Sequence, residues 1–168
     1  ASLNGYRLTQ AIGGLEVVME RTKAAGTQRT HEYRVLATDL LQTMENELRG
    51  PASVGFRVVG QTRALNDSLI VRDRVEEVAI LECPLANEER TRNAYRLLST
   101  KKVSTLQEEL EEAGHGGYRL SPLQARWGYA VLVERPIGDV QRAFDYIVLS
   151  AARSQTMQSE MDRMSAKG

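Results

Sequence analysis

Short apolar stretches alternate with amphipathic ones along the whole chain. Three apolar stretches each end in a glutamate, and they read LEVVME, VAILE and YAVLVE. Their length and their branched residues are typical of strands. Between them, apolar residues recur four positions apart, which predicts helices with one apolar side. These pairs are Met44 with Leu48, Leu106 with Leu110, and Met157 with Met161.

The same pattern occurs more than once. A Gly-aromatic-Arg triplet stands at residues 5–7, 55–57 and 117–119, each time ahead of one of the apolar stretches. A second block begins with a tyrosine and reads YRVLATDLLQTMENEL, YRLLSTKKVSTLQEEL and YIVLSAARSQTMQSEM. The triplet glycine follows 22 residues after Tyr33 and Tyr95, and the same count from Tyr146 reaches Gly168. We therefore expect an internal repeat with one unit divided between the two ends.

Each unit is predicted to run strand, helix, strand, strand. The first strands are expected at 33–36, 95–98 and 146–149, and Thr43, Thr105 and Thr156 are placed as helix N-caps. Gly50 and Gly114 are expected to end the first two helices. The fold class is therefore α+β, with three βαββ repeat units and a two-layer arrangement that has the helices on one face of the sheet. Whether the units share one sheet or close around a pseudo-threefold axis stays open.

We take residues 1–168 as a single repeat domain with four segments. Residues 1–30 form the C-terminal half of a unit, a hairpin. Residues 31–90 form a complete unit with an extended hairpin, and residues 91–140 form a second complete unit. Residues 141–168 form the N-terminal half of a unit, a strand followed by a helix.

One unit carries a recognisable motif. Residues 95–98, the pair Leu106 and Leu110, and residues 117–120 and 132–135 fit a pattern of Tyr-x-Val-Val, Leu-x-x-x-Leu, Gly-Trp-x-Leu-Val and a strand ending near Leu-x-Arg. The unit resembles a family of small bacterial βαββ domains of unknown function. Tyrosine or phenylalanine replaces the family's tryptophan at 6, 56 and 118, and the tandem arrangement is a departure. The resemblance implies a fold and no functional residues. On it alone rests our expectation of an exported bacterial protein, periplasmic or secreted, with a cytoplasmic location as the alternative.

Composition narrows the class of function. Lys plus Arg total 22 and Asp plus Glu total 22, so the formal net charge is zero, which argues against a dedicated nucleic-acid binder. No apolar run approaches the roughly 20 residues of a membrane-spanning helix. Hydrophobic residues make up 42% of the chain, enough for a substantial core. Cys83 is the only cysteine, which excludes an intrachain disulfide.

The arginines of the three triplets form the first candidate surface. Because successive strand residues point to opposite faces, each arginine is expected to face away from the apolar neighbours on either side of it. The simplest interpretation is a set of cross-strand pairs with the glutamates, on a hydrated sheet face. The alternative is an arginine-lined surface for an anion or an acidic partner. The three residues are Arg7, Arg57 and Arg119.

Two further features are candidate interaction sites. The middle hairpin is longer than the other two, and its extra residues are either a tolerated loop insertion or an interaction arm. The arm would present Leu65, Leu69, Ile70 and Val71. Trp127, the only tryptophan, is expected in a turn, where it either anchors an interface or folds back on its own hairpin.

The methionines of the last helix are expected in the core, or in an interface if another molecule completes the divided unit. They are Met157, Met161 and Met164.

No catalytic or cofactor motif is recognised in the sequence. His31 and His115 lack ligand spacing to Cys83, so no metal site is predicted, and no cofactor is expected. Our first hypothesis is a non-enzymatic structural or protein-interaction module that binds a protein partner or forms a homo-oligomer. The alternative is a sensor domain for a small ligand or anion, which uses the repeated arginines at the sheet face or at the seams between units. An enzyme of unrecognised type is a third reading.

Overall fold

The chain folds as an α+β protein with eight strands and three helices among the residues that the structure describes. The structure is a computed structural model, and it describes residues 6–13, 16–21, 30–66, 74–86, 89–121, 130–138 and 142–166. The α+β class predicted from the sequence is confirmed. The elements are β1 (Arg7–Gly13), β2 (Glu16–Glu20), β3 (His31–Thr38), α1 (Leu41–Ser53), β4 (Arg57–Asn66), β5 (Arg74–Pro84), β6 (Asn93–Ser99), α2 (Val103–His115), β7 (Arg119–Leu120), β8 (Ala130–Pro136) and α3 (Ser154–Ser165).

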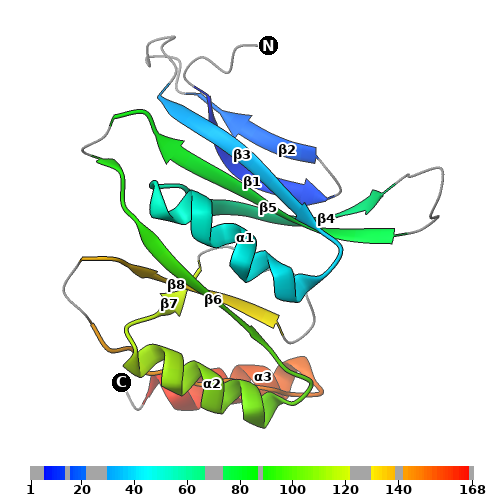
Figure 1. The fold of residues 1–168 in the computed structure, drawn as a ribbon. Coiled ribbons are helices and arrows are strands. Elements are labelled where there is room, and N and C mark those ends of the chain that lie inside the picture. Colours follow the sequence, from blue (N-terminus) through cyan, green and yellow to red (C-terminus); the bar gives the residue numbers. More distant parts are fainter. Residues whose placement is uncertain are drawn as a thin grey trace.

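The described strands form three separate antiparallel sheets. They are the outer hairpin β1–β2, the first sheet in the order β3-β5-β4, and the second sheet in the order β6-β8-β7. In Figure 1 the first sheet lies in the upper half of the view with the outer hairpin behind it, and α2 and α3 lie at the bottom. The described strands therefore do not form one continuous sheet.

The three hairpins share one register. Each triplet arginine lies opposite the glutamate that ends the apolar stretch on the paired strand. In the two three-stranded sheets, the tyrosine of the first strand also lies opposite that glutamate, with Tyr33 facing Glu82 and Tyr95 facing Glu134. The arginine pairs are Arg7 with Glu20, Arg57 with Glu82, and Arg119 with Glu134.

Helix α1 packs between the first and second sheets. Met44 and Leu48 on its apolar side are fully buried, and they share one core cluster with Leu81 of β5 and Leu132 of β8. The expected two-layer arrangement is thus extended, because the one buried side of α1 contacts the second sheet as well as its own sheet. Figure 1 shows α1 between these two groups of strands.

Helices α2 and α3 differ in how much of their apolar side is covered. Leu106 and Leu110 of α2 pack with Val133 of β8 and with Tyr146 and Val148 of the following segment. Helix α3 has no buried residue. The apolar stripe of this helix is therefore at the surface, and the prediction that its methionines belong to the core is wrong.

The predicted helix ends are also wrong. The N-caps are Leu40, Lys102 and Arg153, none with a side-chain capping bond, so the threonines lie in the first turn. There, the Thr43 hydroxyl donates to the Leu40 carbonyl oxygen at 2.8 Å. Both glycines expected as stops lie inside helices, since α1 continues to Ser53 and α2 to His115.

Gly114 is held by the segment that crosses the end of α2. The Phe144 N–H donates to the Gly114 carbonyl at 3.1 Å, and a Cβ on Gly114 would lie 2.1 Å from the Phe144 carbonyl oxygen. No side chain fits at that distance unless the backbone moves. The close approach therefore depends on glycine at this position.

We predict that Gly114→Ala destabilises the protein, although alanine normally favours a helix. The added methyl group should lower the free energy of unfolding by about 1–3 kcal/mol, as overpacking does. Gly50→Ala is the matched control, because Gly50 is also in a helix and has open space around it. That change should raise the unfolding free energy by about 0.5–1 kcal/mol. Urea unfolding measures both, and equal stabilisation by the two changes would contradict the prediction.

Candidate functional site

A buried glutamate connects the outer hairpin to the first sheet. The Glu82 side chain is only 2% exposed, yet it is bound from two directions. The Arg7 guanidinium of β1 donates from Nη2 at 2.8 Å and from Nε at 3.1 Å, and the Tyr33 hydroxyl donates at 2.7 Å. The Tyr33 oxygen in turn accepts from the Leu8 N–H at 3.1 Å. We call this set of contacts the first junction.

The first junction shifts the pKa values of its own members. Burial alone raises the pKa of the Glu82 carboxyl, but the hydrogen bonds from Arg7 and Tyr33 outweigh burial and hold that pKa below its usual value. Burial, together with the bond to Glu82, raises the pKa of Tyr33 to about 12. The hydrogen bond to Glu82 also raises the pKa of Arg7. At neutral pH the junction therefore holds a carboxylate, a neutral phenol and a guanidinium.

A second junction of the same kind joins the first sheet to the second. The Val58 N–H donates to the Tyr95 oxygen at 2.9 Å, and the Tyr95 hydroxyl donates to Glu134 at 3.3 Å. Glu134, 1% exposed, also accepts from Arg119 at 3.1 Å and lies 3.9 Å from Arg57. Burial first, and then the charge of Glu134, raise the pKa of Tyr95.

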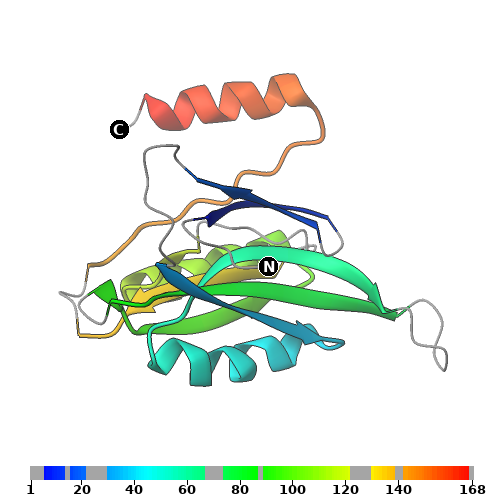
Figure 2. The same ribbon diagram turned by 90° about the horizontal axis from the view of Figure 1, so that it is seen from above.

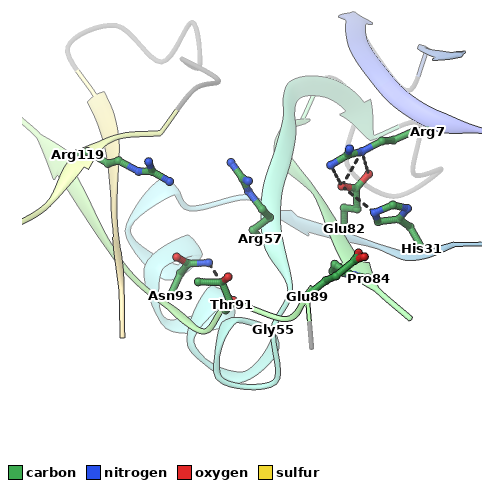
Figure 3. Close-up of a pocket in the computed structure, with 10 residues that line it drawn as sticks. All are labelled: Arg7, His31, Gly55, Arg57, Glu82, Pro84, Glu89, Thr91, Asn93 and Arg119. Atoms are coloured by element: carbon green, nitrogen blue, oxygen red, sulfur yellow. Dashed lines mark hydrogen bonds and ion pairs between the residues drawn. The ribbon is translucent and has the colours of Figure 1, made fainter. Parts of the chain in front are cut away.

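The two junctions bring the three predicted arginines together around one pocket. The pocket has a volume of about 290 Å³ and opens between the outer hairpin and the two sheets. In Figure 3 the side chains of Arg57 and Arg119 extend into the same space, while Arg7 is turned towards Glu82 and His31. Polar residues that line it include Arg7, His31, Arg57, Thr91, Asn93 and Arg119.

The charges around the pocket are largely compensated. Arg7 is paired with Glu82, and Arg57 and Arg119 share Glu134. We had predicted that the glutamates lie on a hydrated sheet face, and this is wrong for Glu82 and Glu134, because the neighbouring layer covers them. Glu20 is exposed. Arg57 is the least engaged of the three, since its only contact with a described residue is the 3.9 Å ion pair. The arrangement can accept an anion at Arg57, but its first effect is to fasten the layers together.

A third junction lacks its glutamate. The Leu120 N–H donates to the Tyr146 oxygen at 3.1 Å, as at the other two junctions. The Tyr146 hydroxyl then donates to the Tyr118 carbonyl at 3.0 Å, and no carboxylate of the described residues contacts it. Burial raises the pKa of Tyr146. Arg119 and Tyr146 are thus two parts of a three-part arrangement.

The segment that carries Tyr146 has an open edge. The Val148 N–H donates to Gln107 of α2 at 2.6 Å, as the Leu97 N–H of β6 donates to Glu45 of α1 at 3.1 Å. Strand amides alternate in direction, so the amides of Ile147 and Leu149 point to the opposite edge. There they have no hydrogen bond to any described residue. The predicted strand at 146–149 is extended but unpaired.

The other sequence-predicted sites are not tested. Leu69, Ile70, Val71 and Trp127 lie outside the described residues, and of Leu65 the structure describes only its place in β4. The predicted interaction arm and the aromatic anchor therefore stay predictions.

Sequence reasoning used the three tyrosines as markers of the repeat and overlooked them as contact residues. The signal was present, because a tyrosine recurs at the first position of each copy of the second block. These residues are Tyr33, Tyr95 and Tyr146.

Comparison with other proteins adds no assignment. No protein-family model, no curated protein and no solved structure matches the chain. The family resemblance drawn from the motif is therefore untested. Among the described residues, no helix is long and apolar enough to cross a membrane, and no group of His, Cys, Asp and Glu is arranged to hold a metal ion.

We predict that Glu82→Gln destabilises the protein in a pH-dependent way. At pH 7 the variant should lose about 1–3 kcal/mol of unfolding free energy, because Arg7 and Tyr33 lose a charged acceptor. The folded-state pKa of Glu82 lies below the ordinary 4.5, so its contribution is present above about pH 4.5 and is lost as the pH falls towards the folded value. Wild type and variant should therefore converge at low pH.

The control is Glu112→Gln, on a side chain that is 72% exposed and pairs with Arg96. Exposed pairs contribute about 0–1 kcal/mol, so this variant should stay close to wild type. Urea unfolding at a series of pH values measures both. A loss in Glu82→Gln that does not change with pH would show that the carboxylate charge is not what stabilises the junction.

Proposed function

We propose that this protein is a non-enzymatic structural or protein-interaction module, built from βαββ repeat units that bind one another at tyrosine–arginine–glutamate junctions. The observation that carries the proposal is the open half-unit at residues 142–166. It has an unpaired strand edge at 146–149, an exposed Ile147 and a helix with no buried residue. Edges of this kind bind another strand readily. The proposed function is therefore the binding of a protein segment that pairs with the open edge and covers the exposed helix.

The state of the titratable groups supports a non-catalytic role. A general acid or base works best with a pKa near the operating pH. Here the pKa values of the tyrosines are raised and that of Glu82 is lowered, which moves all of them away from neutrality. Each of these groups is also engaged in holding two layers together.

We expect the open edge to be detectable by hydrogen exchange in dilute protein. The amides of Ile147 and Leu149 should exchange at least about 100-fold faster than those of Arg96 and Leu98, which occupy the matching positions of the paired strand β6. Amide-resolved NMR exchange measures the four rates within one sample. Equal protection at both pairs would mean that the edge is already covered in the isolated chain, and the interaction proposal would fall.

Anion binding at the pocket is the second candidate function. The observation that favours it is a pocket lined by three arginines, of which Arg57 and Arg119 extend into it and Arg57 is only weakly engaged. The Asn93 amide and the Thr91 hydroxyl are neutral polar groups on the same wall, suited to an oxyanion. The nearby glutamates oppose a strongly charged ligand, so the pocket suits a small mono- or dianion.

The anion hypothesis predicts a thermal shift at fixed ionic strength. Phosphate, sulfate or a small dicarboxylate should raise the melting temperature relative to chloride, and Arg57→Gln should remove that shift. Arg163→Gln serves as the control, because Arg163 is 60% exposed on α3 and distant from the pocket in sequence. A shift that survives Arg57→Gln, or that Arg163→Gln removes equally, would exclude the pocket as the site.

A further inference from the structure

We propose that the open half-unit is completed by the β1–β2 hairpin of a second copy of this chain. The proposal rests on the interaction role proposed above and names its partner. It extends an interface that the chain already makes twice within itself, at the first and second junctions. Every position that the missing half would supply has a counterpart in the hairpin.

The first match is the strand ladder. Tyr33 and Tyr95 each lie opposite the glutamate that ends the last strand of their sheet. Tyr146 placed opposite Glu20 of the second copy sets Ile147 opposite Met19 and Val148 opposite Val18. In the isolated chain Val17 and Val18 are both exposed, whereas the matching Val131 and Leu132 of β8 pack against helices on either side. The free amides of the open edge gain partners in this ladder.

The second match is electrostatic. Arg7 binds Glu82 of the following sheet, and Arg57 faces Glu134 in the same way. Arg119 and Tyr146 have no such carboxylate from a following sheet. Glu20 is exposed, and it has the strand position of Glu82 and Glu134 in its own hairpin. In the complex it receives the phenol of Tyr146 and the guanidinium of Arg119.

The third match joins two exposed side chains. Arg34 stacks on Phe56 at 4.3 Å and Arg96 on Tyr118 at 5.8 Å, each pair between the first strand and the triplet aromatic of one unit. The corresponding pair is Ile147 with Tyr6 of the second copy. Both are exposed apolar side chains in the isolated chain. An isoleucine takes the place of the arginine, so this contact becomes apolar.

The fourth match covers α3. Leu97 packs on α1 and Val148 on α2, whereas Val35, at the same position of β3, is 59% exposed because no helix precedes it. Helix α3 of one copy fits that face of the next copy's first sheet. Gln158 of α3 then corresponds to Glu45 and Gln107, which accept the strand amides of Leu97 and Val148. In the complex, the Val35 N–H of the second copy donates to the Gln158 side chain.

The partner is a second copy because the two halves are remote within one chain. The outer hairpin lies in the upper half of Figure 1, and α3 lies at the bottom, below the second sheet. Figure 2 shows the same stack from above, with the chain running from the second sheet out to α3. One end binds the other end of the next copy, so the contact is heterologous and continues into a chain of molecules.

Two variants that each block one end test this directly. Ile147→Asp places a charge on the open edge, at a side chain that is 55% exposed, and Val18→Asp does so on the hairpin, at one that is 41% exposed. Light scattering should give wild type a mass that grows with concentration. Each variant alone should remain at the 18.7 kDa of one chain, and an equal mixture should form a species of twice that mass and nothing larger.

Ile137→Asp is the matched control, with the same substitution at a side chain that is 50% exposed and outside the proposed contact. It should assemble as wild type does. Circular dichroism and the melting temperature establish that each variant is folded. Wild type that stays at one chain mass over the whole concentration range would overturn the second-copy proposal. Fast exchange at Ile147 and Leu149 would in that case leave the interaction role intact, with a different protein as partner.

A cross-link provides a readout that does not depend on disrupting the surface. Met19→Cys on one copy and Ile147→Cys on another face each other in the proposed ladder, while the native Cys83 is buried. Mild oxidation of the mixture should give a covalent dimer of the two variants in high yield. Replacing Ile147→Cys by Ile137→Cys should reduce that yield at least tenfold. Equal yields would overturn the proposed register.

Discussion

The architecture depends on keeping two buried glutamates charged. A buried carboxylate is costly unless a cation and hydrogen-bond donors surround it. Glu82 meets this need with Tyr33 of its own sheet and Arg7 of the preceding hairpin. Glu134 does so with Tyr95, Arg119 and the more distant Arg57. In each case one of the arginines that compensate the carboxylate comes from the preceding layer. The charge is therefore buried and compensated only when the two layers are joined.

The local features of the fold could be predicted from the sequence, because they depend on short-range patterns. The apolar stretches identify the strands at 33–36 and 95–98. The apolar residues four positions apart identify the central parts of the three described helices. The shared register of arginine and glutamate follows from aligning the triplets. The stretch at 146–149 has the same pattern but forms no ladder, because a strand also needs a neighbour.

The burial of the glutamates could not be predicted from the sequence. A glutamate at the end of an apolar strand is usually near water, and hydropathy does not reveal that a phenol and a guanidinium from other parts of the fold surround it. The pairing of Arg57 shows the same limit. Its neighbour in the ladder is Glu82, yet its only ion pair with a described residue is the one with Glu134 of the next sheet. The ion-pair partner of a long side chain such as Arg57 depends on which layer lies next to it. The packing of helix α1 against both sheets determines how the first and second sheets lie next to each other.

The position of α1 also determines how the molecule responds to mechanical load. Its one apolar side packs against both sheets, so tension along the stack is carried by side-chain packing and junctions and not by a strand ladder. Such contacts separate layer by layer, beginning where the packing buries least. Helix α3, with no buried residue, is at that end. Under a force applied at its C-terminus, the molecule is expected to unfold one layer at a time, starting with α3, and its extension is expected to increase in one step per layer.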